Sequence, residues 1–188
     1  MRSSRCTVAR ASLALRAGGV IAYPTEAVFG LGCDPWCGQA FEKLLRIKGR
    51  AMSKGVILIA AQFGQLRRLL DPDAADLWPA ARRTWPGPVT WIMPARRSVP
   101  SWLTGGRSTI AVRVTDHPVA AALSRAFGGP LVSTSANRSG SSALRDARKV
   151  RLSLGSGLDF VVHAGVGGRA QPSEIRDAVR DRVLRAGD

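Results

Sequence analysis

One arrangement occurs twice in this chain of 188 residues, and it limits the possible folds more than any other feature. A segment with apolar residues at helical spacing is followed by two glycines, a short apolar run and a polar stretch. The first copy has Gly18-Gly19 before the run at 20–23, and the second has Gly128-Gly129 before the run at 131–133. Helices that alternate with short apolar strands are typical of α/β domains, whose ligands usually bind at strand ends. We therefore predict one α/β domain with its ligand site among the polar stretches.

The remaining elements are predicted from the same periodicities. Pro24 ends the first apolar run because it lacks a backbone donor, and the glycines after it indicate a loop over 29–32. Apolar residues three or four positions apart predict helices near 8–15, 41–48, 66–70, 73–83, 118–127 and 142–152. Short apolar or alternating runs predict strands at 20–23, 56–60, 89–93, 109–114, 131–133 and 159–163.

The charge balance indicates a polyanionic partner. The chain has 28 Lys and Arg against 13 Asp and Glu, a formal net charge of +15. Such an excess favours binding to nucleic acid or to a phosphate-rich small molecule. The cations are spread along the chain, however, and a GC-rich genome can raise the arginine content without any function. Both interpretations remain open from composition alone.

The sequence contains no sign of a membrane or secretory segment. No apolar run approaches the roughly 20 residues that a membrane helix needs. The three cysteines have no disulfide spacing, which fits a reducing compartment. Cys33, Cys37, His117 and His163 are too irregularly spaced for a zinc site, so we predict no protein metal centre. We expect a cytoplasmic protein without a membrane partner.

Two groups of polar residues are candidates for the ligand site. Lys48, Arg50 and Lys54 lie within seven residues and together could neutralise a triphosphate, although cations are also favoured at helix C-termini. Ser133, Ser135 and Asn137 alternate at a strand end, which would place two hydroxyls and an amide on one side. The alternative is that these groups only satisfy their own turn. The sequence has no Walker A loop and no Ser-His-Asp arrangement, so nucleophilic catalysis is disfavoured.

Six motifs, in order along the whole chain, resemble the YrdC/Sua5 family, and in particular its short bacterial branch. They are Tyr23-Pro24-Thr25-Glu26-Ala27-Val28-Phe29-Gly30-Leu31-Gly32, Lys48-x-Arg50 with Lys54-Gly55, Trp85-Pro86-Gly87-Pro88-Val89-Thr90, Ala111-Val112-Arg113-Val114, Ser133-Thr134-Ser135-Ala136-Asn137 and Pro172-Ser173-Glu174-Ile175-Arg176. One departure is Ala51, which stands where many members have proline.

The resemblance implies a fold for residues 1–188: a single twisted mixed sheet flanked by helices, YrdC-like and related to the RibB-type fold. It also implies short strands near Ser173–Asp177 and Val183–Arg185. The apolar period from Ile175 to Val183 instead indicates a helix. We follow the resemblance at this point.

The resemblance further implies an activity. Family members combine L-threonine, bicarbonate or CO2, and ATP to give L-threonylcarbamoyladenylate and pyrophosphate, a nucleotidyltransferase reaction. The product serves the N6-threonylcarbamoyl modification of tRNA adenosine, which implies the TsaB/TsaD/TsaE transferase complex as a downstream partner. The rival hypothesis is a non-catalytic module of the same fold that binds double-stranded RNA or tRNA.

The site residues are carried over from the family motifs. Lys48 and Arg50 are expected to act in catalysis on the phosphates, with Mg2+ sharing the charge. The other residues expected to bind ATP are Lys54, Arg113, Ser133, Ser135, Asn137 and Arg169. The threonine pocket is expected to contain Thr25, Thr115 and Ser173.

Overall fold

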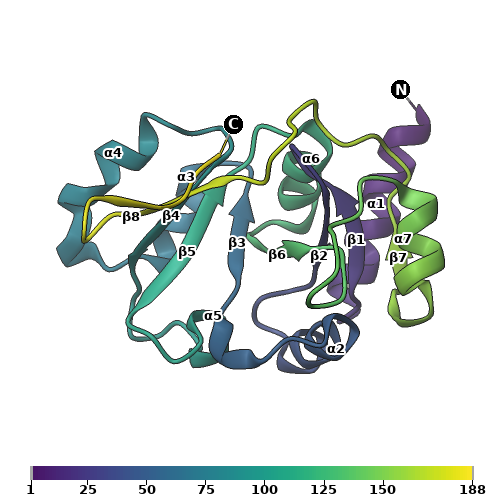
Figure 1. Cartoon of the computed structure of the whole chain (residues 1–188), viewed down its shortest axis with the longest axis horizontal. Helices are drawn as coiled ribbons and strands as arrows, with labels where there is room; N and C mark the ends of the chain where they lie inside the picture. Colours follow the sequence, from purple (N-terminus) through teal and green to yellow (C-terminus); the bar gives the residue numbers. More distant parts are fainter. Residues whose placement is uncertain (1, 188) are drawn as a thin grey trace.

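The structure is a computed structural model that describes residues 2–187. Its strands are β1 Ile21–Pro24, β2 Phe29–Gly32, β3 Ile57–Ala60, β4 Val89–Pro94, β5 Thr109–Val114, β6 Leu131–Ser135, β7 Phe160–Val161, β8 Glu174–Asp177 and β9 Arg182–Arg185. They form one mixed sheet of nine strands in the order β7-β1-β2-β6-β3-β5-β4-β8-β9 (Figure 1). The predicted mixed sheet flanked by helices is confirmed.

Seven α-helices and four 3-10 segments connect these strands within residues 2–187. The helices are α1 Arg2–Arg16, α2 Gly38–Lys48, α3 Phe63–Leu66, α4 Trp78–Arg82, α5 Ser101–Thr104, α6 Pro118–Phe127 and α7 Ala147–Leu154. The 3-10 segments are η1 Met52–Lys54, η2 Arg67–Leu69, η3 Pro72–Leu77 and η4 Gly155–Gly157. No helix among the described residues has both the length and the apolar character that crossing a membrane requires.

The two faces of the sheet have different neighbours. On β5 the alternation holds as predicted, since Ile110, Val112 and Val114 are buried in the larger apolar core. On the opposite face, α1 and α6 contact each other and cover β1, where Ile21 and Tyr23 belong to a second apolar core. The rest of that second face, across β6, β3, β5 and β8, borders the cavity described below.

The prediction of a glycine loop at 29–32 is wrong, because this segment forms β2. It pairs antiparallel with β1 and with β6. A Cβ atom on Gly32 would lie 2.5 Å from the carbonyl oxygen of Val132 and 2.6 Å from the ring of Tyr23. Glycine is therefore required at position 32 because neighbouring atoms of the sheet leave no room for a side chain. Such close approach is a known reason for glycine within a strand.

Three predicted helices differ from the structure. The helix expected at 66–70 overlaps α3 only at Leu66, and η2, a 3-10 segment, covers Arg67–Leu69. The segment 73–83 is divided between η3 and α4, because Pro79 lies in the first turn of α4 and cannot donate the hydrogen bond that would join the two. The helix expected from 142 begins only at Ala147. The carboxylate of Asp146 caps it by accepting hydrogen bonds from the backbone N–H groups of Arg148 and Lys149, and residues 136–146 form a loop.

The C-terminal segment forms two strands. The family resemblance implied these strands, whereas the apolar period indicated a helix. Strand β8 lies parallel to β4, and β9 returns antiparallel to it. Asp181, in the turn between them, has a φ of 45°. The pairing of β8 with β4 thus overrides the helical period, since sheet contacts commonly outweigh local propensity.

Candidate active site

A cavity of about 430 Å³ lies against the second face of the sheet, within the size range of small-molecule sites. Its floor contains alternate residues of the strands, among them Ala111 and Arg113 of β5 and Ser133 and Ser135 of β6. Its walls come from the loops at 25–28, 50–56, 103–107 and 169–173. The candidate site therefore spreads over a sheet face, whereas we expected a site confined to the strand ends.

The lining of this cavity has a strong excess of positive charge. The basic ones are Arg50, Lys54, Arg107, Arg113, Arg169 and Arg185, and Glu26 is the one acidic residue among the described lining residues. Low-dielectric walls with charges of one sign concentrate the electrostatic field. The cavity is therefore suited to a ligand with several negative charges.

Eight of the eleven predicted site residues line the cavity. These are Arg50, Lys54, Arg113, Ser133, Ser135, Arg169, Thr25 and Ser173. The other three are Lys48, Asn137 and Thr115, which do not belong to the lining. Each of these three instead forms a hydrogen bond with a lining residue: Lys48 and Asn137 with Ser135, and Thr115 with Glu26. Their assignment to the ligand site stays a prediction.

Lys48 lies behind the wall of the cavity, with 3% of its surface exposed. Its Nζ donates to the carbonyl oxygen of Ser135 at 2.6 Å and to Asn137 Oδ1 at 2.8 Å, and the Ser135 hydroxyl and Asn137 carbonyl lie at 3.2 Å. Burial, followed by the charge of Arg50, lowers the pKa of Lys48 to about 8, against the oxygen acceptors that favour the ammonium form. Lys48 thus fixes the hydroxyl-bearing turn rather than facing the cavity.

Arg50 does face the cavity, from the loop after α2. Its Nη2 donates to the carbonyl oxygen of Gly55 at 3.0 Å, and its buried Nε has no hydrogen-bond partner among the described residues. Ala51 has φ −67° and ψ 139°, the conformation that proline would impose, so the loop keeps its shape without proline. An unpaired buried donor at a cavity wall is available to an anionic ligand.

Arg107 stands beside the same loop and was not predicted. Its Nη1 donates to the carbonyl oxygen of Thr104 at 3.2 Å. Gly105, which follows Thr104, packs against Ser53 and Gly55, since a Cβ atom on Gly105 would lie 2.5 Å from the Ser53 carbonyl oxygen. Arg50, Lys54 and Arg107 therefore gather at one end of the cavity, although Arg107 is more than fifty residues away in sequence from the other two.

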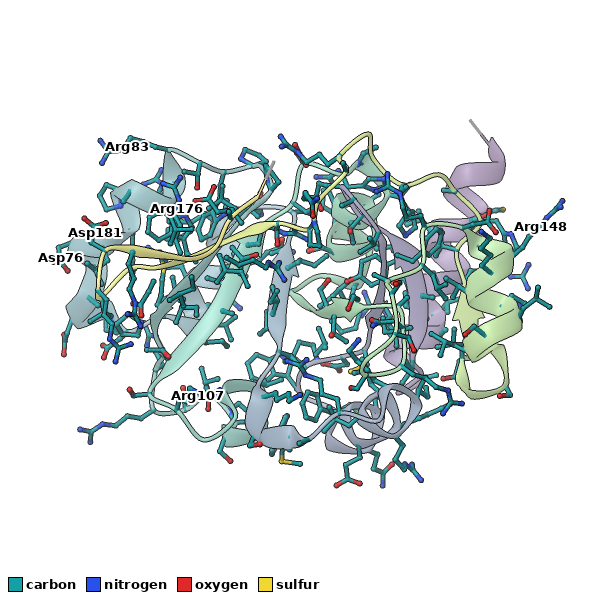
Figure 2. The ribbon with its side chains drawn as sticks, viewed as in Figure 1. Asp76, Arg83, Arg107, Arg148, Arg176 and Asp181 are labelled. Atoms are coloured by element: carbon teal, nitrogen blue, oxygen red, sulfur yellow. The ribbon has the colours of Figure 1, made fainter. Side chains whose placement is uncertain are left out.

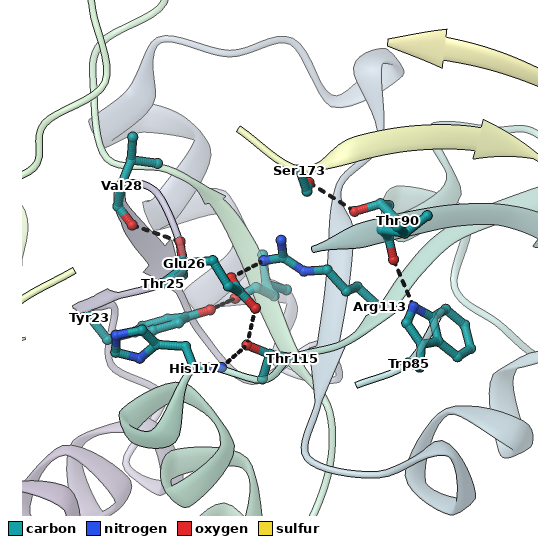
Figure 3. A network of polar contacts seen from close by, with 12 residues as sticks. Tyr23, Thr25, Glu26, Val28, Trp85, Thr90, Arg113, Thr115, His117 and Ser173 are labelled. Atoms are coloured by element: carbon teal, nitrogen blue, oxygen red, sulfur yellow. Dashed lines mark hydrogen bonds and ion pairs between the residues drawn. The ribbon is translucent and has the colours of Figure 1, made fainter. Parts of the chain in front are cut away.

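The opposite end contains a buried ion pair (Figure 3). Arg113 Nη2 lies 3.2 Å from Glu26 Oε2, and Thr115 Oγ1 donates to Glu26 Oε1 at 2.5 Å. Burial alone would raise the pKa of Glu26, but Arg113 and the Thr115 hydrogen bond outweigh it and lower that pKa. Glu26 is therefore a carboxylate at neutral pH. Glu26 was not among the predicted site residues, although it stands next to Thr25 in the first polar stretch.

The backbone of residues 165–169 closes this end of the cavity. The N–H of Gly167 donates to the carbonyl oxygen of Thr25 at 2.9 Å, and that of Arg169 to the carbonyl oxygen of Glu26 at 3.3 Å. The Nε2 of buried His117 lies 3.2 Å from the carbonyl oxygen of Gly165, to which it donates. Three contacts thus hold this loop in place and aim Arg169 at the cavity.

Arg185 adds a cation from β9 that sequence reasoning also missed. Its Nη2 donates to the carbonyl oxygen of Ser173 at 2.6 Å and lies 3.3 Å from the Ser173 hydroxyl, which also contacts Thr90. Burial, and then the nearby charge of Arg113, lower the pKa of Arg185. No sequence motif pointed to Arg185, because only the antiparallel pairing of β9 with β8 brings it to Ser173 and near Arg113.

The fold and the site define an α/β protein whose mixed sheet has a cation-lined cavity on one face, a cavity suited to an anionic small molecule. A family model named Sua5/YciO/YrdC and described as "Telomere recombination" matches residues 13–187, and the chain belongs to this family.

Known relatives cover nearly the whole chain. A protein of Nitrosococcus oceani named threonylcarbamoyl-AMP synthase is 55% identical over 171 residues, which are 91% of this chain and 92% of the relative. The crystal structure of Sua5 from P. abyssi complexed with L-threonine has a TM-score of 0.89 and 30% identity. That match covers 96% of this chain and 54% of the longer Sua5 chain. E. coli YciO has a TM-score of 0.83 at 30% identity, with 98% and 90% of the two chains covered.

Proposed function

We propose that this chain makes L-threonylcarbamoyladenylate and pyrophosphate from L-threonine, bicarbonate or CO2, and ATP. The observation that carries the proposal is the single cavity with cations at both ends and one carboxylate, in a chain similar to threonylcarbamoyl-AMP synthases. A triphosphate and an amino-acid carboxylate together require such a distribution of positive charge. The relatives support this enzyme over a non-catalytic RNA-binding module.

The cation cluster of Arg50, Lys54 and Arg107 binds the ATP phosphates in this proposal. Carbamate formed on the threonine amine attacks the α-phosphorus, a new P–O bond forms, and the bond to the β-phosphate oxygen breaks to release pyrophosphate. Such a nucleotidyl transfer depends mainly on positioning and charge neutralisation, so cations matter more than a protein nucleophile. Lys48 contributes indirectly by holding Ser135.

The amino acid is held at the other end. Arg113, Arg169 and Arg185 offer guanidinium groups for its carboxylate, and Thr25 and Ser173 provide hydroxyl groups on the same walls. The hydroxyls of Ser133 and Ser135 lie between the two ends on β6 and contact the nucleotide. This division places the amine of threonine and the α-phosphate of ATP in one cavity.

Mg2+ enters with ATP as part of the substrate in this scheme. No group of three His, Cys, Asp or Glu residues lies together among residues 2–187, and the cavity lining offers the carboxylate of Glu26, which is paired with Arg113. The metal is therefore held by phosphate oxygens, its preferred ligands. We also propose that the product passes to the TsaB/TsaD/TsaE complex for transfer to tRNA.

Mass spectrometry of a mixture with ATP, L-threonine and bicarbonate tests the proposed function. Threonylcarbamoyl-AMP and pyrophosphate should appear together, and neither should appear when threonine is omitted. Arg50→Ala should lower the rate by about 100-fold or more, because a charge-assisted phosphate contact is lost. Arg46→Ala removes an exposed cation of α2 outside the cavity and should leave the rate unchanged. Absence of product from the unaltered protein would reject the proposal.

A further inference from the structure

We propose that Glu26 binds the α-ammonium group of the amino acid. This inference rests on the proposed function and assigns a recognition role to Glu26. It starts from the charges of the cavity. Mg2+ stays with the ATP phosphates in the proposed function, so the ammonium is the positive group of the substrates that the protein itself must match.

The cavity has one negative group to match that ammonium. Six cations line the cavity, and among the described lining residues Glu26 is the one acid. An ammonium placed elsewhere in the cavity would face guanidinium or ammonium groups, which repel it. Like charges brought together in this way cost several kcal/mol in an interface, so complementarity selects the position beside Glu26.

The local geometry leaves one Glu26 oxygen available. Oε1 accepts the hydrogen bond from Thr115, whereas Oε2 is buried, has the ion pair with Arg113, and lacks a hydrogen-bond donor among the described residues. Glu26 is 5% exposed, so its carboxylate is largely removed from bulk solvent and faces the cavity. A buried carboxylate oxygen without a donor is costly, and an ammonium N–H from the ligand would satisfy it.

A ligand comparison tests recognition of the ammonium. L-Threonine and 2,3-dihydroxybutanoate, in which a hydroxyl replaces the ammonium, are titrated calorimetrically into the protein. The unaltered protein should bind threonine at least about 10-fold more tightly, as expected for a hydrogen bond to a charged group. Equal binding of the two ligands would overturn the assignment without any variant, so the test does not depend on whether Glu26 tolerates substitution.

Glu26→Gln should remove that preference while ATP still binds. The control is Glu174→Gln, because Glu174 is also paired with an arginine, Arg176, but lies outside the main cavity. We expect Glu26→Gln to bind threonine about 10- to 100-fold more weakly than the unaltered protein. Its affinities for threonine and 2,3-dihydroxybutanoate should differ by less than about threefold. Glu174→Gln should bind both ligands as the unaltered protein does. Retention of the full preference by a folded Glu26→Gln protein would contradict the proposal.

Product formation by the unaltered protein separates failure of this assignment from failure of the proposed function.

Discussion

At the scale of single residues, the ammonium of Lys48 determines where two other side chains stand. Four oxygen atoms of Ser135 and Asn137 surround its Nζ, and the Ser135 hydroxyl in turn donates to Asn137 Oδ1 at 2.7 Å. A buried cation is stable only when such acceptors compensate its desolvation. The same contacts fix the Ser135 hydroxyl at the cavity wall, so in the proposed function Lys48 acts on the nucleotide through Ser135.

Lys48→Met should change the pH dependence of stability. The pKa of Lys48 falls from 10.5 to about 8 in the fold, so between these values the unfolded chain binds the proton that the folded protein has released. The free energy of unfolding of the unaltered protein should therefore rise over this window relative to the variant, by about 1 to 3 kcal/mol. Below about pH 8 both states are protonated, and this difference is constant.

Urea unfolding at pH 7.5, 9 and 10.5 measures the effect. Lys149→Met, which removes an exposed lysine of α7, serves as the control and should follow the unaltered protein at every pH. Parallel pH profiles for Lys48→Met and the unaltered protein would show that the ammonium retains its ordinary pKa in the fold.

At the scale of elements, the loop at 165–169 depends on close approach to the first polar stretch. A Cβ atom on Gly167 would lie 2.5 Å from the carbonyl oxygen of Glu26 and 2.9 Å from its Cα. The obstacle is backbone, which cannot move aside without shifting β1 or the loop. At Gly165 and Gly168, by contrast, a Cβ would meet no atom within 4 Å.

Gly167→Ala should therefore displace the loop and with it Arg169, lowering kcat/KM for threonine by about 10-fold or more, as misplaced substrate contacts do. Gly168→Ala offers a control in the same loop and should retain full activity. Steady-state kinetics of the two variants, with circular dichroism to show that both fold, compare the two positions. Equal kinetics would mean that the contact with Glu26 does not position Arg169.

How far the sequence predicts the fold and the site also differs among elements. The spacing of apolar residues is sufficient for α6 and for the two faces of β5, because each follows one period along its length. For β8 and β9 it indicates a helix, since the deciding contact is pairing with β4, more than eighty residues earlier. The site follows the same rule. The motif places Lys48 and Arg50 together, but only the end of α2 determines that one is buried behind the wall and the other faces the cavity.

At the scale of the whole molecule, the positive charge is distributed and not confined to one patch. Figure 2 shows Arg83 and Arg148 on opposite sides of the molecule. With a net charge of +15, the molecule attracts polyanions from all sides, and the field of the six lining cations adds to that attraction at the cavity. ATP should therefore experience electrostatic steering, whereas zwitterionic threonine has no net charge on which such a field can act.

Salt should therefore reduce kcat/KM for ATP more than for threonine. Raising KCl from about 50 to 300 mM shortens the screening length, and we expect a fall of about 5- to 10-fold for ATP. The value for threonine at saturating ATP should change by less than about twofold. Steady-state assays over a KCl series, with Mg2+ held constant, provide the measurement. Equal falls for both substrates would indicate a general effect of salt on the enzyme.

The register of the sheet has a consequence for the newly made chain. Gly30 pairs with Ser135, and Val89 pairs with Glu174, so the walls of the cavity meet only through contacts between distant segments. Such long-range pairings form late and slowly, because closing the intervening loops costs entropy before any contact repays it. Affinity for substrates should thus arise abruptly in the final folding step, and a half-finished polypeptide would sequester neither ATP nor threonine.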